Sequence, residues 1–179
     1  MHKDFEKLVF SEVDLDKRVK ELAERINKDY EGKEIMILCI LKGGIIFMSD
    51  LSKYITVPME MDFMAVSSYG NSTKSSGVVR IIKDLERSIE GKDIIIVEDI
   101  VDSGLTLSYL KENLMQRNPN SIRICTLLER ASRDKSVIEV EYVGYTVDDG
   151  FLVGYGLDYA EKYRNIPYIG ILKPEIYEK

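Results

Sequence analysis

The sequence predicts an α/β fold organised around a mainly parallel β-sheet. Uninterrupted apolar runs such as "DIIIV" at 93–97 are typical of strands that are covered on both faces, as central parallel strands are. Segments with apolar residues at helical spacing alternate with these runs, which is the pattern of βα units. The 179 residues suit one domain, 1–179, because a single core typically holds about 100 to 200 residues and no linker or repeat divides the chain.

The first part of the chain predicts a helix, a strand and a second helix. Apolar residues from Leu15 to Ile26 recur at helical spacing, so we expect an amphipathic helix over 14–30. In 34–55 an apolar run is interrupted by Lys-Gly-Gly at 42–44 and then resumes. This arrangement predicts a strand, a tight turn and a helix.

Two strands joined by a long loop are expected next. Residues 57–69 and 78–82 are rich in β-branched and other apolar side chains, whereas 70–77 contains no apolar residue and is expected to be a mobile loop. The chain then continues with a strand at 93–97, a helix that ends before Pro119, and strands at 121–128, 139–147, 151–155 and 168–172.

The composition argues against several classes of function. The formal net charge of −6 and the pI near 5.0 disfavour a broad nucleic-acid surface, which needs clustered Lys and Arg. No window approaches the roughly 18 apolar residues of a membrane span. The N-terminus lacks the apolar segment of a signal peptide, so a cytoplasmic location is expected. A small anionic substrate is compatible with this charge, because it needs only a local positive site.

The few histidines and cysteines argue against metal, redox and histidine-dependent catalytic sites. Cys39 and Cys125 lie in apolar runs without the spacing of metal ligands or redox pairs, so we expect buried thiols. His2 is the only histidine and is expected in a frayed terminus, which removes Ser-His and Cys-His schemes. A carboxylate or a lysine is therefore the expected general base.

Three carboxylates, Glu98, Asp99 and Asp102, directly follow the predicted strand at 93–97. In open α/β sheets ligands bind beyond the carboxyl ends of the strands, so these acids are expected at a site. The sequence "DSGLT" at 102–106 then opens a helix whose backbone N–H groups can surround a phosphate. Acids beside a phosphate repel it unless sugar hydroxyls or a divalent cation lie between them, which indicates a phosphorylated sugar. For Asp102 alone, a structural helix cap is the alternative.

The stretch "VEDIVDSGLT" at 97–106 resembles the phosphoribosyl-pyrophosphate signature of the type I phosphoribosyltransferases. Three further segments, 41–44, 67–77 and 151–170, occur in the same order as in the hypoxanthine-guanine members of that family. Together these segments run through nearly the whole chain, so the resemblance is far more specific than a single motif.

The resemblance implies both a fold and a reaction. The fold would be that of a type I phosphoribosyltransferase, with a small β-rich hood from the N-terminal segment and about 150–179, and a lid loop at about 69–77. The reaction would transfer the 5-phosphoribosyl group from phosphoribosyl pyrophosphate to N9 of hypoxanthine or guanine, giving IMP or GMP and pyrophosphate. Mg²⁺ is the implied cofactor. A homodimer or homotetramer is expected, with no nucleic-acid or membrane partner.

The same resemblance implies a role for each matched residue. Asp102 would be the general acid/base at purine N7, and Glu98, Asp99 and Asp158 would approach Mg²⁺. The peptide between Lys42 and Gly43 is often cis in the family. The phosphoribosyl-pyrophosphate site would comprise Lys42, Gly43, Ser68, Tyr69, Glu98, Asp99, Asp102, Ser103, Gly104, Leu105, Thr106 and Arg164. The purine site would comprise Arg130, Phe151, Leu152 and Asp158.

One segment departs from the family pattern. Bacterial relatives usually carry a sequence like "LLDKP", whose lysine donates to the purine 6-oxo group, whereas this chain has "LLERA" at 127–131. Arg130 can still donate, but a planar guanidinium does not replace an ammonium without consequence. The ranking of hypoxanthine, guanine and xanthine is therefore open, and a xanthine-preferring enzyme is an alternative.

Two alternatives come from other classes of protein. A signalling receiver domain also places acids after a parallel strand, but after its first strand, whereas here several strands precede them. A non-catalytic nucleic-acid-binding regulator on the same fold is disfavoured by the net charge of −6.

Overall fold

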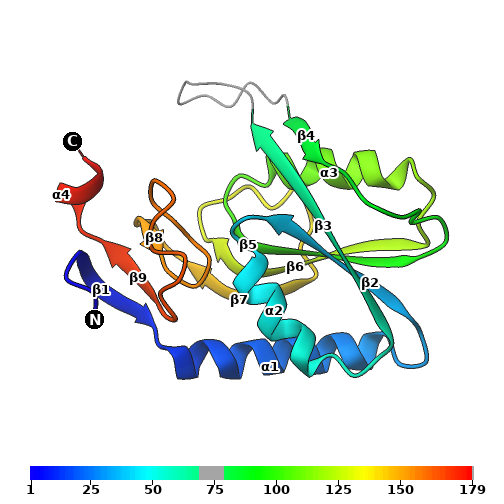
Figure 1. The fold of residues 1–179 in the computed structure, drawn as a ribbon, viewed down its shortest axis with the longest axis horizontal. Coiled ribbons are helices and arrows are strands. Elements are labelled where there is room, and N and C mark those ends of the chain that lie inside the picture. Colours follow the sequence, from blue (N-terminus) through cyan, green and yellow to red (C-terminus); the bar gives the residue numbers. More distant parts are fainter. Residues whose placement is uncertain (69–78, 179) are drawn as a thin grey trace.

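The computed structural model describes residues 1–68 and 79–178 (Figure 1). The predicted lid at 69–77, which includes Tyr69, lies outside these residues. In chain order the elements are β1 (Phe5–Phe10), α1 (Glu12–Asp29), β2 (Ile35–Leu41), α2 (Ile45–Tyr54), β3 (Met59–Ser68), β4 (Val79–Lys83), β5 (Asp93–Val101), α3 (Leu105–Met115), β6 (Ser121–Arg130), β7 (Tyr142–Val147), β8 (Leu152–Val153), β9 (Ile169–Leu172) and α4 (Pro174–Tyr177).

A six-stranded sheet in the order β4-β3-β2-β5-β6-β7 forms the centre of the molecule. β3, β2, β5, β6 and β7 pair in parallel, and only β4 is antiparallel to its neighbour. The predicted α/β fold with a mainly parallel sheet is therefore confirmed. None of the helices in the described ranges is long and apolar enough to cross a membrane.

Helices cover the two faces of this sheet separately (Figure 1). α1 and α2 pack on one face, in a core that includes Phe47 and Ile95, and α3 packs on the other, where Leu110 and Ile94 meet. Side chains alternate between the faces of a strand, so Ile94 and Ile95 belong to different cores. This is the physical reason for the uninterrupted apolar run at the start of β5.

The strand β5 is longer than the sequence indicates. It continues to Val101 rather than ending at 97, because it keeps its parallel pairing with β6 through the acidic residues, as at Glu98 and Thr126. Glu98 and Asp99 therefore lie within the strand rather than after it. The predicted strand at 151–155 is shorter than expected, since only Leu152–Val153 has strand geometry.

A second, three-stranded antiparallel sheet joins the two ends of the chain in the order β1-β9-β8. Phe5 is 2% exposed and packs against Val153 and Leu172. The backbone N–H of His2 donates to the hydroxyl of Tyr168 at 2.7 Å. The expectation of a frayed terminus at His2 is therefore wrong, because β1 finds its partner strand about 160 residues further along the chain.

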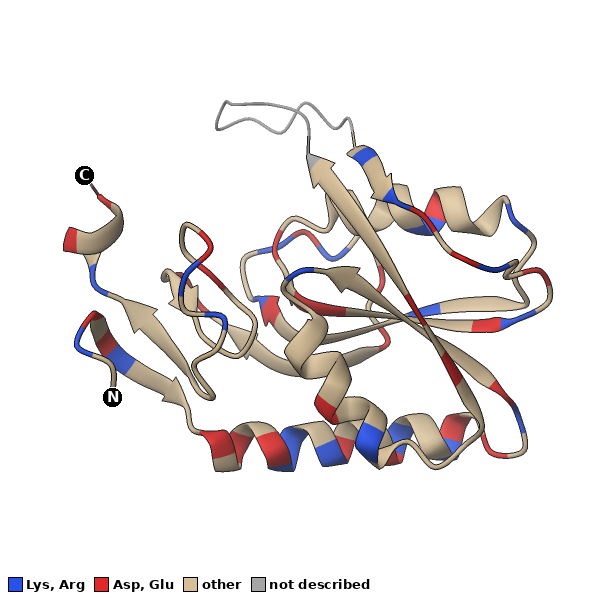
Figure 2. Cartoon of the chain, in the orientation of Figure 1, with Lys and Arg blue, Asp and Glu red and all other residues tan. Residues whose placement is uncertain are grey.

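Charged side chains are distributed over the whole chain. Along α1 a group of acidic residues at the start is followed by basic and then mixed charges, and both signs are interspersed in the loops (Figure 2). Two ion pairs within α1 illustrate this, Lys20 with Asp16 at 2.6 Å and Arg18 with Glu21 at 2.8 Å. The charges that neighbour a given residue therefore say more about its interactions than the net charge of the chain does.

Candidate active site

The end of β5 and the start of α3 enclose a small cavity of about 150 Å³. Gly104 has φ 79°, in the left-handed region, and begins α3 without a side-chain cap. A Cβ at Gly104 would lie 2.7 Å from Ile138 Cγ2, so both the backbone and the packing require glycine here. The first N–H groups of α3 have no partner within the helix and border this space. The cavity is lined by Glu98, Ile100, Val101, Asp102, Ser103, Gly104, Thr106 and Leu107.

Glu98 and Asp99 form an adjacent pair of half-buried carboxylates beside this cavity. Burial raises the pKa of the Glu98 carboxyl well above its usual range, and the negative charge of Asp99 adds to the shift. Asp99 Oδ1 accepts a hydrogen bond of 2.8 Å from the Ile100 N–H. Hydroxyl donors or a cation at this position would favour the ionised form of Glu98.

Asp158, the third predicted metal-binding residue, does not join this pair. Its Oδ1 lies 2.9 Å from Arg164 Nη2, and its Oδ2 accepts from the Glu161 N–H at 2.8 Å. Over the described parts of the chain, no group of three or more His, Cys, Asp or Glu side chains is placed to hold a metal ion. Glu98 and Asp99 therefore fit Mg²⁺ only as a two-carboxylate site completed by water and substrate oxygens, a common way of binding magnesium.

The turn between β2 and α2 lies directly against the acidic pair. A Cβ on Gly43 would overlap the Asp99 carboxylate, and a Cβ on Gly156 would overlap the carbonyl oxygen of Gly43. Three segments that are distant in sequence are therefore in close contact at Gly43. The cis peptide bond of this turn joins Leu41 and Lys42, one residue before the Lys42-Gly43 peptide that is often cis in the family.

The two predicted pyrophosphate-binding cations meet at Glu161. Lys42 Nζ lies 2.9 Å from Glu161 Oε2, and Arg164 Nη2 lies 3.4 Å from Glu161 Oε1. The hydrogen bond from Lys42 holds the pKa of the Glu161 carboxyl below its usual range. The sequence reasoning did not single out Glu161, because an acid in a polar loop resembles an ordinary surface residue. Its place within the matched segment 151–170 was the only available signal.

Arg130 joins the end of β6 to the turn between β7 and β8. Its Nη1 donates to the Asp148 carbonyl at 2.6 Å, and its Nη2 donates to the Gly150 carbonyl at 2.8 Å. Each of these nitrogens has a second hydrogen, so the guanidinium can still donate to a ligand. Arg130 therefore also positions the turn that precedes Phe151.

Phe151 and Leu152 lie differently in the small sheet. The Phe151 ring stacks on Tyr177 with centroids 4.9 Å apart and meets Tyr159 edge-on at 5.4 Å. Tyr177 therefore covers one face of the Phe151 ring. Leu152 is buried in β8, where it pairs with Ile171. Its contribution to a site would come from the backbone.

The unusual residue Glu129 forms a buried ion pair with Arg133. The side chains are 3% and 2% exposed, and Arg133 Nε donates to Glu129 Oε1 at 2.8 Å. Arg133 Nη1 donates to the Ile138 carbonyl at 3.0 Å. Burial alone raises the pKa of the Glu129 carboxyl, but hydrogen bonds from Arg133 and Lys135 outweigh it and hold this pKa below its usual range.

Comparisons with known proteins agree on one family. The family model described as phosphoribosyl transferase domain matches residues 13–160. The hypoxanthine-guanine phosphoribosyltransferase of Bacillus subtilis (strain 168) is 55% identical over 178 residues, which cover 99% of each chain. The bifunctional protein TilS/HprT of Listeria innocua is 52% identical over 100% of this chain, which spans 28% of that longer protein. A crystal structure of a hypoxanthine phosphoribosyltransferase from Staphylococcus aureus has a TM-score of 0.96 at 50% identity, covering 100% of this chain and 97% of that one.

Proposed function

Because this chain belongs to the phosphoribosyltransferase family, we propose that it is a purine salvage enzyme. It transfers the 5-phosphoribosyl group of phosphoribosyl pyrophosphate to N9 of hypoxanthine or guanine, and the products are IMP or GMP and pyrophosphate. The observation that carries this proposal is the cavity between β5 and α3, where acids and helix-terminal N–H groups border one space of about 150 Å³. A phosphorylated sugar satisfies both kinds of group.

The phosphoribosyl group is proposed to lie along 98–106. The 5′-phosphate accepts hydrogen bonds from the N–H groups of 102–106, including Gly104 and Leu105, and from the hydroxyls of Ser103 and Thr106. The ribose hydroxyls donate to Glu98 and Asp99. The raised pKa of Glu98 is consistent with a carboxylate that gains its hydrogen-bond donors only when the sugar is bound.

Mg²⁺ is the proposed cofactor. Bound to the pyrophosphate, it would neutralise negative charge on the leaving group. Glu98 and Asp99 are the residues proposed to hold it. Asp158 would reach it only through water, since Arg164 occupies one of its carboxylate oxygens at 2.9 Å.

The pyrophosphate is proposed to bind at the Lys42-Gly43 turn and Arg164. Both cations contact Glu161 in this structure, so the incoming pyrophosphate takes over contacts that Glu161 now makes. Cations at this place offset the negative charge that develops on the leaving group. Ser68, the last residue of β3, and Tyr69 are proposed to complete the pyrophosphate site.

The purine is proposed to lie between the acidic turn and the small sheet. Asp102 exchanges the proton at purine N7, as the carboxylate that the family resemblance places there. The Phe151 ring stacks on the base, and the Leu152 backbone reads its edge. Arg130 donates to the 6-oxo group. Asp158 lies on the side of the guanine amino group.

The proposed function is tested by supplying phosphoribosyl pyrophosphate and Mg²⁺ with hypoxanthine, guanine, xanthine or adenine separately. Nucleotide and pyrophosphate should form in equal amounts with hypoxanthine or guanine and not with adenine. A preference for xanthine would be attributed to Arg130, and Arg130→Lys should then shift the ranking towards hypoxanthine and guanine. Absence of nucleotide with every oxopurine would contradict the proposal.

We also propose the setting in which the enzyme works. Residues 1–179 form one domain in which the sheet β1-β9-β8 and about 150–179 act as a hood over the purine. Assembly as a homodimer or homotetramer is proposed from the family to which the chain belongs. Sedimentation analysis tests the assembly. The proposed location is the cytoplasm.

A further inference from the structure

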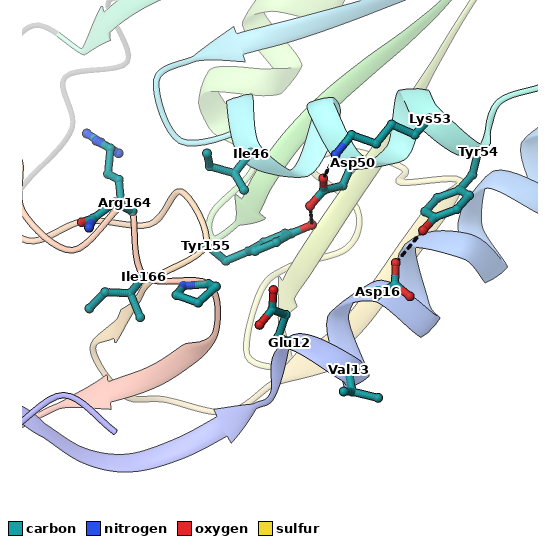
Figure 3. A pocket seen from close by; sticks show the side chains of 12 residues that line it. Glu12, Val13, Asp16, Ile46, Asp50, Lys53, Tyr54, Tyr155, Arg164 and Ile166 are labelled. Atoms are coloured by element: carbon teal, nitrogen blue, oxygen red, sulfur yellow. Dashed lines mark hydrogen bonds and ion pairs between the residues drawn. The ribbon is translucent and has the colours of Figure 1, made fainter.

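A second cavity, of about 510 Å³, lies between α1, α2 and the segment that ends in Pro167 (Figure 3). Two tyrosines on its wall make the same kind of contact. The Tyr155 hydroxyl donates to Asp50 Oδ2 at 2.6 Å, and the Tyr54 hydroxyl donates to Asp16 Oδ1 at 2.7 Å. The two tyrosines differ in the segments that carry them: Tyr54 is the last residue of α2, whereas Tyr155 lies in the loop that follows β8.

Tyr155 belongs to a segment with unusual backbone geometry. Gly154, Tyr155 and Gly156 have φ values of 98°, 52° and 102°, all in the region that disfavours side chains. Tyr155 is 5% exposed, and its N–H donates to the Ile166 carbonyl at 2.7 Å. A non-glycine residue keeps such a conformation only when its surroundings hold it there. The hydrogen bond to Asp50 is one of these restraints.

Gly156, the next residue, contacts both parts of the proposed pyrophosphate site. Its Cα lies so close to the Gly43 carbonyl that a Cβ would overlap that oxygen. Its own carbonyl accepts a hydrogen bond of 2.8 Å from Arg164 Nη1. A displacement at Tyr155 would therefore move Arg164 relative to the Lys42-Gly43 turn.

Asp50 links Tyr155 to the Lys42-Gly43 turn through helix α2. It lies in α2, the helix that begins at Ile45, directly after the Lys42-Gly43-Gly44 turn. The bond between Tyr155 and Asp50 thus spans the two segments that touch at Gly43 and Gly156, which are more than 100 residues apart in sequence. Lys53 holds the other Asp50 oxygen at 2.7 Å and orients the carboxylate towards Tyr155.

We propose that Tyr155 and Asp50 form a positioning pair that determines where Arg164 lies relative to the Gly43 turn, and thereby the affinity for the pyrophosphate group. Neither residue touches the substrate. The inference rests on the proposed function, because it assigns the pair to the pyrophosphate part of that site. It adds two residues that the sequence analysis did not connect to the reaction.

The test compares Tyr155→Phe with the matched control Tyr54→Phe. Each variant loses one tyrosine-to-aspartate hydrogen bond from the wall of the same cavity. Tyr155→Phe should raise the KM for phosphoribosyl pyrophosphate about five- to tenfold, as expected for one lost hydrogen bond, with kcat and the KM for hypoxanthine changed less than about twofold. The Kd of inorganic pyrophosphate with Mg²⁺, measured by calorimetry without turnover, should rise by the same factor. Tyr54→Phe should leave all these values unchanged.

Variants of Asp50 provide the second measurement. Asp50→Ala should reproduce the rise in KM, Asp50→Asn should restore part of the affinity because it keeps an acceptor oxygen, and the double variant Tyr155→Phe/Asp50→Ala should be no worse than the stronger single variant. Unchanged pyrophosphate binding in Tyr155→Phe, an equal loss in Tyr54→Phe, or additive losses in the double variant would each overturn the inference. A wild-type protein that makes no nucleotide would instead overturn the proposed function, so the two failures are distinguishable.

Discussion

Single carboxylates in this site have different surroundings although they look alike in the sequence. Asp102 is exposed at the cavity between β5 and α3. Glu98 is half-buried next to Asp99, and its pKa is raised by burial and by that neighbour. Asp158 is held by Arg164. These surroundings are compatible with the proposed roles, in which Asp102 transfers the proton, Glu98 and Asp99 accept from hydroxyl donors or bind a cation, and Asp158 supports them.

The proposed role of Asp102 predicts a large effect on turnover. Asp102→Asn should lower kcat about 10²- to 10⁴-fold, because the amide cannot exchange the purine proton, while the Kd of phosphoribosyl pyrophosphate stays within about twofold. Steady-state kinetics and calorimetry provide the two values. Asp149→Asn, at an exposed acid in the turn between β7 and β8, is the control and should keep normal turnover. Near-normal kcat in Asp102→Asn would refute the assignment.

The raised pKa of Glu98 predicts a pH-dependent effect on stability. The folded protein retains a proton on Glu98 at pH values where the unfolded chain has lost it, so this carboxyl reduces stability as the pH rises above its unfolded pKa of about 4.5. Glu98→Gln removes that cost and should raise the free energy of unfolding at pH 8 by about 0.5 to 2 kcal/mol, with a smaller gain at pH 4. Urea unfolding of wild type and variant at both pH values measures this change in the free energy of unfolding. Glu112→Gln, on the exposed side of α3, should show no such difference.

At the scale of elements, the end of β6 supports both halves of the site. Glu129 pairs in register with Val101 of β5, the residue before Asp102. Its ion-pair partner Arg133 binds the carbonyl of Ile138, whose side chain packs against Gly104 at the start of α3. The loop 131–138 therefore packs against Gly104 at the start of α3, and the Glu129–Arg133 pair holds this loop in place.

Breaking this pair on one side should destabilise the protein. Arg133→Met leaves Glu129 buried with an incomplete set of partners, and the free energy of unfolding should fall by about 3 to 5 kcal/mol. The double variant Glu129→Leu/Arg133→Met should recover much of the loss, because a buried charge no longer lacks its partner. Denaturant unfolding measures both variants. Lys135→Met, whose ammonium is mostly exposed, should cost at most about 1 kcal/mol, and an equal loss there would argue against the role of Arg133.

The contribution of Glu129 to stability changes with pH in the opposite direction to that of Glu98. The folded pKa of Glu129 lies below its unfolded value, so its contribution to stability is present above the unfolded pKa and is lost as the pH falls through the folded pKa. Wild-type protein should therefore lose stability towards acid more steeply than the double variant. Equal slopes of stability against pH below about pH 4.5 would contradict this.

At the scale of the whole molecule, the small sheet connects the two ends of the chain beside the large sheet. β1 and β9 pair over most of their length, and β9 pairs with β8 on its other side (Figure 1). Phe151 directly precedes β8. The segment that leads from β8 to β9 carries Tyr155, Gly156, Asp158 and Arg164. The packing of the N-terminal strand therefore determines where the proposed purine and pyrophosphate contacts lie.

This arrangement predicts a high cost for a change near the N-terminus. Phe5→Ala removes a ring that is 2% exposed in the small core, and should reduce the free energy of unfolding by about 3 to 5 kcal/mol. Leu8→Ala, in the same strand but 44% exposed, is the control and should cost less than about 1 kcal/mol. Thermal unfolding followed by circular dichroism compares the two. Similar small losses would mean that β1 contributes little to the fold.

The local pattern of the sequence was sufficient for most elements of the large sheet. The continuous apolar run in β5 and the helical spacing of Leu107, Leu110 and Leu114 are periodic patterns that can be read from residues close in sequence, although the partners that bury them are distant. β1 was missed because a six-residue strand with only one fully buried residue has no distinctive pattern until β9 pairs with it. The boundary of β5 was misjudged because acids are unusual in a strand and are tolerated here at a site.

The sequence by itself determined the fold class, the family, and the order of the acids and of the Ser-Gly turn at 103–104, since all of these depend on residues that are adjacent or regularly spaced along the chain. Only the tertiary structure decided which groups meet: Glu161 with Lys42 and Arg164, Arg133 with Ile138, and Tyr155 with Asp50. The physical reason is that ion pairs and hydrogen bonds depend on distances of about 3 Å between atoms, and folding brings such atoms together across any separation in sequence.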